Sequence, residues 1–131
     1  MIHDEQYDLG LQLRRDMFGP AGADDQVGST DEWDDKLQEL VTRHVFGDIW
    51  QRPGLDRKTR SLVTLAMLVA SNRAHEVGIH LRGALSNGVT PEELRELMLH
   101  ASVYCGIPAA VDGIRAARAA VEERTTVGGQ A

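Results

Sequence analysis

Apolar residues recur every three or four positions along most of the chain, the spacing that puts side chains on one face of an α-helix. The first segment of this kind carries Leu9, Leu13 and Met17 with charged residues between them. No segment shows the alternation of apolar and polar residues that is typical of a β-strand. The sequence therefore predicts an all-α protein, a bundle of about six helices near residues 7–18, 30–46, 57–72, 74–86, 91–105 and 108–124.

Several predicted helices carry residues that favour a helix start or a helix end. The run Thr90-Pro91-Glu92-Glu93 supplies a cap, a first-turn proline and a reciprocal carboxylate, in the order of a capping box. The pair Asn87-Gly88 suits the left-handed backbone that follows a helix. Ser29 has the capping-box spacing to Glu32, so we expect it to open the second helix.

Two segments lack the apolar residues that hold a chain in a fixed shape. Residues 21–29 are mostly small, acidic or glycine and are predicted to form a loop, and residues 125–131 are predicted to be a disordered tail. A chain of 131 residues, 42% of them hydrophobic, can form one core but not two. We predict a single domain over residues 1–124. The segment 57–72 is apolar on nearly all sides, which predicts either the central core helix or an oligomer interface. Together with the alanine-rich last helix it leads us to expect a homo-oligomer.

The charge balance argues against nucleic acid as a partner. Lys and Arg total 14 against 20 Asp and Glu, and the net charge of -6 would repel phosphates. A carboxylate ligand would need a local cluster of arginines. Cys105, the one cysteine, cannot form an internal disulfide. The N-terminal segment lacks the positive charge of a signal peptide, and the apolar run 62–70 is too short to cross a membrane. We expect a cytoplasmic protein without membrane contact.

Glu76 and His80 are the main candidates for chemistry. They lie one turn apart on one face of a predicted helix, with Arg73 on the same side. A carboxylate beside an imidazole can move protons near neutral pH, although a solvated Glu–His pair is the commoner meaning of this spacing. No metal is predicted, because there is no H-E-x-x-H pattern. His75 and Glu76 are adjacent and cannot face one site from a regular helix.

The remaining polar and aromatic candidates fit a pocket wall or a core. Cys105, next to Tyr104, has no second cysteine to react with, and Trp33, Phe46 and Trp50 are expected in the core. Two or three arginines converging on one cleft would bind a dicarboxylate, although a surface ion pair is the commoner role of any one of them. The arginines near the two central helices are Arg43, Arg52, Arg57, Arg60, Arg73 and Arg82.

A set of motifs between about residue 5 and residue 120 resembles the pattern of one known family. The motifs are Tyr7-Asp8-x-Gly10-Leu11-x-x-Arg14-Arg15, Gly47-Asp48-Ile49-Trp50-x-Arg52-Pro53-Gly54-Leu55-Asp56, Asn72-Arg73 with Glu76 and His80, Asn87-Gly88-Val89-Thr90, and Tyr104-Cys105-Gly106-Ile107-Pro108. The second motif is more specific than any single acid–base pair. With these motifs the chain resembles the carboxymuconolactone decarboxylase family.

The resemblance implies an alkylhydroperoxidase-D-like helical fold that assembles into homo-oligomeric rings, either trimers or hexamers. It implies loss of carbon dioxide from 4-carboxymuconolactone to give 3-oxoadipate enol-lactone, in protocatechuate catabolism through the β-ketoadipate pathway. No metal or organic cofactor is expected. His80 and Glu76 would be catalytic, and the residues expected to bind the dicarboxylate lactone are Arg73, Arg60, Trp50, Arg52, Tyr104 and Cys105.

The chain departs from the family pattern at residues 19–28, which leaves the exact lactone open. Thiol peroxidase chemistry is disfavoured, because it needs a C-x-x-C pair. Three alternatives remain: a decarboxylase of a different lactone acid, a residual hydroperoxidase, and a non-catalytic helical oligomer that binds a small acid.

Overall fold

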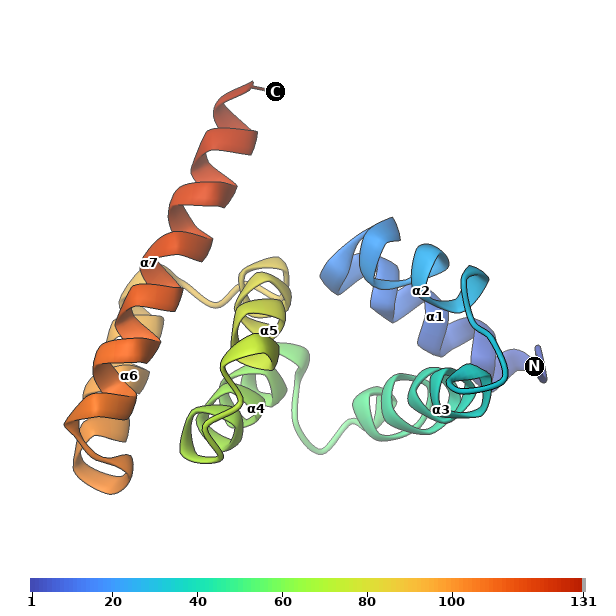
Figure 1. Cartoon of the computed structure of the whole chain (residues 1–131), viewed down its shortest axis with the longest axis horizontal. Coiled ribbons are helices and arrows are strands. Elements are labelled where there is room, and N and C mark those ends of the chain that lie inside the picture. Colours follow the sequence, from blue (N-terminus) through green and yellow to red (C-terminus); the bar gives the residue numbers. More distant parts are fainter. Residues whose placement is uncertain (131) are drawn as a thin grey trace. The chain divides into compact units, whose positions relative to one another are not determined.

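The computed structural model of the chain describes residues 1–130, with side chains up to Thr126 (Figure 1). Within this range it contains seven α-helices, three short 3-10 or π segments and no strand, which confirms the all-α prediction. The chain divides into two compact units, Met1–Asp56 and Arg57–Ala131, and each is described by itself. The single domain expected from the sequence stays a prediction.

The first unit packs one long helix against a series of short helical segments. α1 (Glu5–Phe18) is followed by η1 (Pro20–Gly22), α2 (Asp24–Gly28), α3 (Asp35–Leu40), the π segment η2 (Val41–Phe46) and η3 (Ile49–Gln51) (Figure 1). The core of this unit is small and consists of Leu13, Met17, Phe46 and Trp50. Polar contacts therefore contribute much of its internal order.

A buried arginine, Arg14, connects α1 to three other parts of the first unit. Its guanidinium donates from Nε to the Gly22 carbonyl oxygen at 3.0 Å, and from Nη1 to Gln38 Oε1 at 2.9 Å and Thr42 Oγ1 at 3.0 Å. Burial lowers the pKa of this guanidinium. The three hydrogen bonds offset the loss of hydration and join α1 to η1, α3 and η2.

Residues 21–29, predicted to form a loop, are largely helical instead, because η1 and α2 lie here. Ala23 is fully buried, and polar anchors add to this apolar contact. One is the buried arginine, and another is the ion pair between Arg15 and Asp24 at 2.7 Å. The capping box expected at Ser29 is also wrong. Ser29 Oγ donates to the Asp25 carbonyl oxygen at 2.7 Å, which closes α2 rather than opening the next helix.

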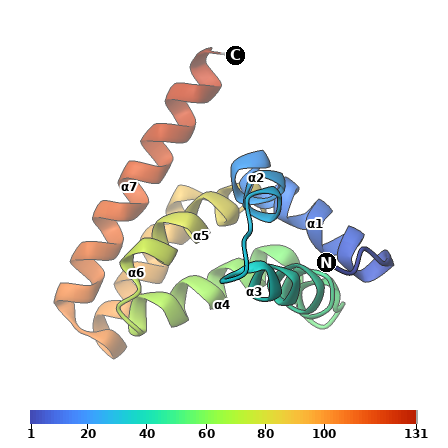
Figure 2. The ribbon, with the colours of Figure 1, turned by 45° about the vertical axis from the view of Figure 1, so that its right-hand side comes forward.

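The second unit consists of four helices around one apolar core. α4 (Arg57–Ala70), α5 (Ala74–Ser86), α6 (Pro91–Cys105) and α7 (Ile107–Gln130) follow one another through short connections (Figure 2). α4 and α7 each pack against both α5 and α6. All four helices contribute buried residues to the core, among them Leu65, Val69, Val77, Leu81, Ala84, Leu94, Met98, Ala101, Ala117 and Ala120.

A tight turn at Asn72 reverses the chain between α4 and α5. Asn72 has a φ of 57°, in the left-handed region that asparagine tolerates better than most residues. The amides of Asn72 and Arg73 donate to the carbonyl oxygens of Val69 and Leu68, the pattern of a Schellman motif. This turn fixes Arg73 as the residue immediately before α5.

The connection from α5 to α6 confirms the stop and start signals in the sequence. Gly88 has a φ of 92° and follows the end of α5. Thr90 and Glu93 form the expected capping box, with Thr90 Oγ1 accepting the Glu93 amide at 3.1 Å and Glu93 Oε1 accepting the Thr90 amide at 2.9 Å. Lys58 on α4 pairs with the same Glu93 carboxylate at 2.9 Å, which ties the start of α6 to α4.

α7 continues to Gln130, whereas the sequence predicts a helix end near residue 124. Thr125 and Thr126 donate their hydroxyl groups to carbonyl oxygens four residues earlier, at 2.9 Å each. Ala131, the last residue of the predicted tail, lies outside the described residues.

Gly10 gives a test of the close approach between α1 and η2. A methyl group at this position would collide with the Thr42 carbonyl oxygen and the Gly47 amide, both backbone atoms. We expect Gly10→Ala to lower the free energy of unfolding by about 1–3 kcal/mol, as overpacking does. The measurement is urea denaturation followed by circular dichroism. Gly28→Ala is the matched control, because a methyl group there meets no atom within 4 Å. Equal stability of the two variants would contradict this packing.

Candidate active site

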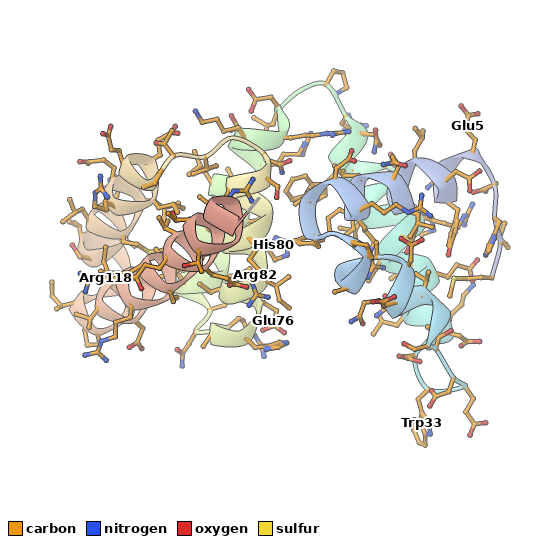
Figure 3. The ribbon with its side chains drawn as sticks, turned by 90° about the horizontal axis from the view of Figure 1, so that it is seen from above. Glu5, Trp33, Glu76, His80, Arg82 and Arg118 are labelled. Carbon is orange, nitrogen blue, oxygen red and sulfur yellow. The ribbon has the colours of Figure 1, made fainter. Side chains whose placement is uncertain are left out.

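The buried face of α5 determines where its polar side chains lie. Val77, Leu81 and Ala84 follow helical spacing and are all buried in the core of the second unit. Glu76 and His80 lie on an adjacent face, one turn apart, and both project from the same side of α5 in Figure 3. Glu76 is exposed and His80 is half-buried. The sequence prediction of a shared face is therefore met.

The environment of His80 favours its neutral imidazole. Burial lowers the pKa of His80 below the ordinary value of 6.5, and the negative charge of Glu76 opposes this effect by favouring the protonated ring. A neutral imidazole can accept a proton at one nitrogen and donate one from the other. His80 therefore has a protonation state suited to proton transfer near neutral pH.

Glu76 influences His80 through its charge rather than through a direct bond. Among the side chains described, up to residue 126, the Glu76 carboxylate forms no hydrogen bond or ion pair. It lies in the first turn of α5, where a negative charge is stabilised by the helix dipole. The exposed carboxylate is thus free to meet a ligand, while the orienting contact to His80 expected from the sequence is not formed.

Arg73 stands at the start of the same helix and lines a small cavity. The cavity has a volume of about 60 Å³, and its polar lining comes from Arg73, Asn72 and Asp112. The Arg73 side chain is exposed and forms no ion pair within the described part of the chain. A cation at the positive end of α5, three residues before Glu76, favours binding of an anionic group at this end of the helix.

Tyr104 and Cys105 line a separate and larger groove between α4 and α6. Its volume is about 1070 Å³, and neither Glu76 nor His80 belongs to its lining. Within the groove the rings of His100 and Tyr104 lie 5.0 Å apart. Arg73, Glu76 and His80 are thus neighbours along the chain at the start of α5, although neither Glu76 nor His80 lines the cavity of Arg73. Tyr104 and Cys105 lie in the groove between α4 and α6.

The groove contains a carboxylate–imidazole pair that sequence analysis did not single out. Glu96 and His100 both line it, and they have the same four-residue spacing on α6 that Glu76 and His80 have on α5. The repeated Glu-x-x-x-His spacing is a signal that would have found them. Their placement makes His100 a natural comparison for His80.

The remaining predicted binding residues have different surroundings. Arg60 is half-buried near the start of α4, and Arg52 is exposed just after η3 in the first unit. Trp50 is buried in the first unit, with its ring 5.7 Å from that of Phe46, so it supports the core. The expectation of a core position was wrong for Trp33, which is exposed on the turn before α3.

The described residues contain neither a cluster of metal-binding side chains nor a membrane-spanning helix. No three His, Cys, Asp or Glu side chains in that range gather as a metal site would require. No helix there combines the length and hydropathy needed to span a bilayer.

The fold and the site together define an all-α protein with an acid–base pair on one helix and an arginine immediately before that helix. Comparison with known proteins identifies the family. The model of the carboxymuconolactone decarboxylase family matches residues 35–119, and the chain belongs to this family. The resemblance noted in the sequence is thereby confirmed.

Two relatives match most of the chain. A nitrosuccinic acid decarboxylase from Metarhizium robertsii is 41% identical over 113 residues, 86% of this chain and 79% of the relative. A 4-carboxymuconolactone decarboxylase from Acinetobacter baylyi is 42% identical over 109 residues, 82% of this chain and 81% of the relative. A protein of the same name from Pseudomonas putida is 35% identical over 48 residues, 37% of this chain and its own full length.

The electrostatic coupling between Glu76 and His80 can be measured by titration. We expect the pKa of His80 to lie below the usual value of 6.5, and Glu76→Gln to lower it further because the charge that favours the protonated ring is lost. The measurement is the pH dependence of the histidine ring nitrogens by NMR. Glu122→Gln, which removes a carboxylate from α7, is the control. An unchanged His80 titration in Glu76→Gln would contradict the coupling.

Proposed function

We propose that this protein is a decarboxylase that converts 4-carboxymuconolactone to 3-oxoadipate enol-lactone, a step of protocatechuate catabolism through the β-ketoadipate pathway. The observation that carries the proposal is the 42% identity to the Acinetobacter baylyi 4-carboxymuconolactone decarboxylase across 82% of the chain. The pairing of Glu76 and His80 on one face of α5 supports it, since the reaction needs a proton to be delivered to carbon.

The chemistry of 4-carboxymuconolactone explains why its decarboxylation needs few groups from the protein. The bond between the leaving carboxyl group and the ring breaks, and its electron pair moves through the ring double bond onto the lactone carbonyl oxygen. Carbon dioxide leaves and an enolate remains. One proton then adds to the ring carbon next to the carbonyl. The lactone itself accepts the electron pair, so no organic cofactor is required for this step.

Three residues at the start of α5 have proposed roles in this reaction. His80 delivers the proton or stabilises the enolate oxygen, because its neutral form can donate from one ring nitrogen and accept at the other. Glu76 raises the basicity of His80 through its charge, or transfers the proton itself. Arg73 binds a carboxylate of the substrate. The other proposed binding residues are Arg60, Trp50, Arg52, Tyr104 and Cys105.

The second relative favours a second candidate substrate of related chemistry. In nitrosuccinic acid the leaving carboxyl group is attached to the carbon that bears the nitro group, so the electron pair released with carbon dioxide moves onto nitro oxygens. That molecule also keeps a second carboxylate. The chain is 41% identical to the Metarhizium robertsii enzyme, so we propose nitrosuccinic acid as the alternative substrate.

We also propose a homo-oligomer, a trimer or hexamer, that acts in the cytoplasm. Exposed apolar side chains support self-association, because a single chain leaves large hydrophobic residues in water. On α4 these include Met67, 64% exposed, and on α6 they include Val103 and Tyr104, 77% and 78% exposed. A single cysteine fits a reducing compartment.

The role of His80 is tested by comparing two histidines with the same spacing from a glutamate. We expect His80→Ala to lower kcat on 4-carboxymuconolactone by about 100-fold or more, with little change in KM, because general acid–base groups contribute this much. His100→Ala, on α6, should keep wild-type kcat. The measurement is carbon dioxide release and ultraviolet absorbance of protein treated with a chelator.

Other outcomes of this experiment would change the proposed site, substrate or reaction. Loss of activity in His100→Ala alone would move the chemistry to the groove between α4 and α6. Activity on nitrosuccinic acid alone would select the second candidate. Loss of wild-type activity on chelation would contradict the cofactor-free reaction. No turnover of either acid by folded protein would favour a different lactone acid, hydroperoxidase chemistry or a non-catalytic role.

Arg73 is expected to contribute to substrate binding rather than to proton transfer. We expect Arg73→Met to raise KM by about tenfold or more, the cost of losing one charge-assisted hydrogen bond to a carboxylate, and Arg73→Lys to recover part of the loss. Arg82→Met is the matched control on the same helix, because Arg82 already pairs with Glu123 at 3.3 Å. Steady-state kinetics of the three variants make the comparison. An unchanged KM in Arg73→Met would remove Arg73 from the site.

A further inference from the structure

The turn before α3 presents a tryptophan to solvent. Trp33 is 88% exposed, and Figure 3 shows it projecting away from the ribbon. Backbone hydrogen bonds to aspartates shape the turn: the Trp33 amide donates to Asp31 Oδ1 at 2.8 Å, and the Asp31 amide donates to Asp34 Oδ1 at 2.9 Å. The indole is therefore held outward on an ordered turn. Rigid aromatic side chains of this kind lose little entropy on binding.

The tryptophan is the first residue of an apolar stripe with acidic borders. Leu37 and Leu40 follow at helical spacing on α3 and are 58% and 48% exposed. We call Trp33, Leu37 and Leu40 the Trp33 stripe. Four carboxylates surround its beginning: Asp31, Glu32, Asp34 and Asp35. Within the described residues none of the four forms an ion pair with a lysine or arginine. A partner for this surface must offer an apolar recess with a positive rim.

The second unit contains a recess of that kind. Two adjoining cavities between α6 and α7, of about 270 and 400 Å³, share Ile114 and Arg118 in their linings. We call them together the α6–α7 groove. Most of the other lining side chains are apolar. The charged ones are exposed and comprise three arginines against one carboxylate, so the lining is positive on balance: Arg95, Arg115, Arg118 and Glu122. Among the described residues none of the three guanidinium groups forms an ion pair or a side-chain hydrogen bond.

The two units carry net charges of opposite sign. Residues 1–56 hold 13 Asp and Glu against 5 Lys and Arg, a net charge of -8, whereas residues 57–131 hold 7 against 9, a net charge of +2. Copies of one chain with this asymmetry attract each other when the first unit of one meets the second unit of the next. The local charges at the Trp33 stripe and the α6–α7 groove repeat the same contrast.

We propose that the Trp33 stripe of one copy docks in the α6–α7 groove of a second copy of this chain. The indole fills the apolar recess, and carboxylates beside Trp33 pair with Arg95, Arg115 and Arg118. This contact joins two different surfaces, so repeated copies form a closed ring or an open chain rather than a two-fold dimer. The proposal rests on the self-association proposed above and assigns it an interface.

Mixing two defective variants tests the contact between copies. Trp33→Ser keeps the groove, and Arg118→Glu keeps the indole. Each variant alone should raise the dissociation constant of the assembly by about tenfold or more, the usual cost of losing an interface anchor. The mixture should give a complex of one copy of each, since one complete contact remains. Sedimentation velocity across a concentration series gives the masses, and tryptophan emission reports whether Trp33 becomes buried.

Matched controls separate this contact from general damage. Leu9→Ser replaces another exposed apolar residue, 46% exposed on α1, and Arg124→Glu reverses a charge on α7 outside the groove lining. Both should keep the wild-type mass. The double variant Glu32→Arg with Arg118→Glu should regain affinity, because the charge pair is exchanged rather than lost.

Three results would overturn the proposal. An assembly of unchanged mass and affinity in Trp33→Ser would show that other surfaces hold the copies together, and would leave self-association intact. A wild-type protein that stays monomeric would remove self-association as well. Shielded Trp33 emission in a monomer, with no complex on mixing, would mean docking within one chain. Decarboxylation is assayed separately and decides none of these outcomes.

Discussion

The packing of α5 into the core of the second unit is the constraint on which the candidate site depends. Val77, Leu81 and Ala84 are buried against α4 and α7, so the helix cannot rotate without exposing them to water. Fixing these three residues also fixes the direction of Glu76 and His80. One turn of one helix then holds two ionisable groups in different surroundings, a carboxylate in solvent and an imidazole that is half-buried. Burial and charge act in opposite directions on the pKa of His80.

The turn before α5 adds the positive charge that an acid substrate requires. Because Asn72 adopts a left-handed backbone and closes a Schellman motif on α4, α5 begins directly after Arg73. The guanidinium group thus stands where the helix dipole is also positive. A chain with a net charge of -6 repels anions at long range, so this local arrangement matters for binding a dicarboxylate. The backbone hydrogen bonds of Asn72 and Arg73 thus determine where this arginine stands relative to α5.

Sequence patterns predicted those parts of the structure that depend on neighbours along the chain. The capping box at Thr90, the stop at Gly88 and the shared face of Glu76 and His80 follow from spacings of four residues or fewer. The patterns failed where contacts between distant residues decide. The helical turns around Gly22 depend on a hydrogen bond from Arg14, which no local composition reveals. Trp33 is exposed although its residue type favours burial.

The pair Glu76 and His80 and the segment 20–28 differ in how far they tolerate substitution. The pair Glu76 and His80 is held by apolar packing, where replacing a buried side chain costs several kcal/mol, so the geometry for moving a proton resists change. Residues 20–28 are held by the carbonyl oxygen of Gly22, by one surface ion pair and by the fully buried side chain of Ala23. A methyl group at Gly22 would collide with the Phe18 side chain, so positions 22 and 23 restrict the residue type. Most other positions of this segment are exposed or half-buried and tolerate substitution more readily. Two relatives of this chain are named as decarboxylases of different acids, as expected where an acid–base pair is held by the core and part of the chain outside that core can vary.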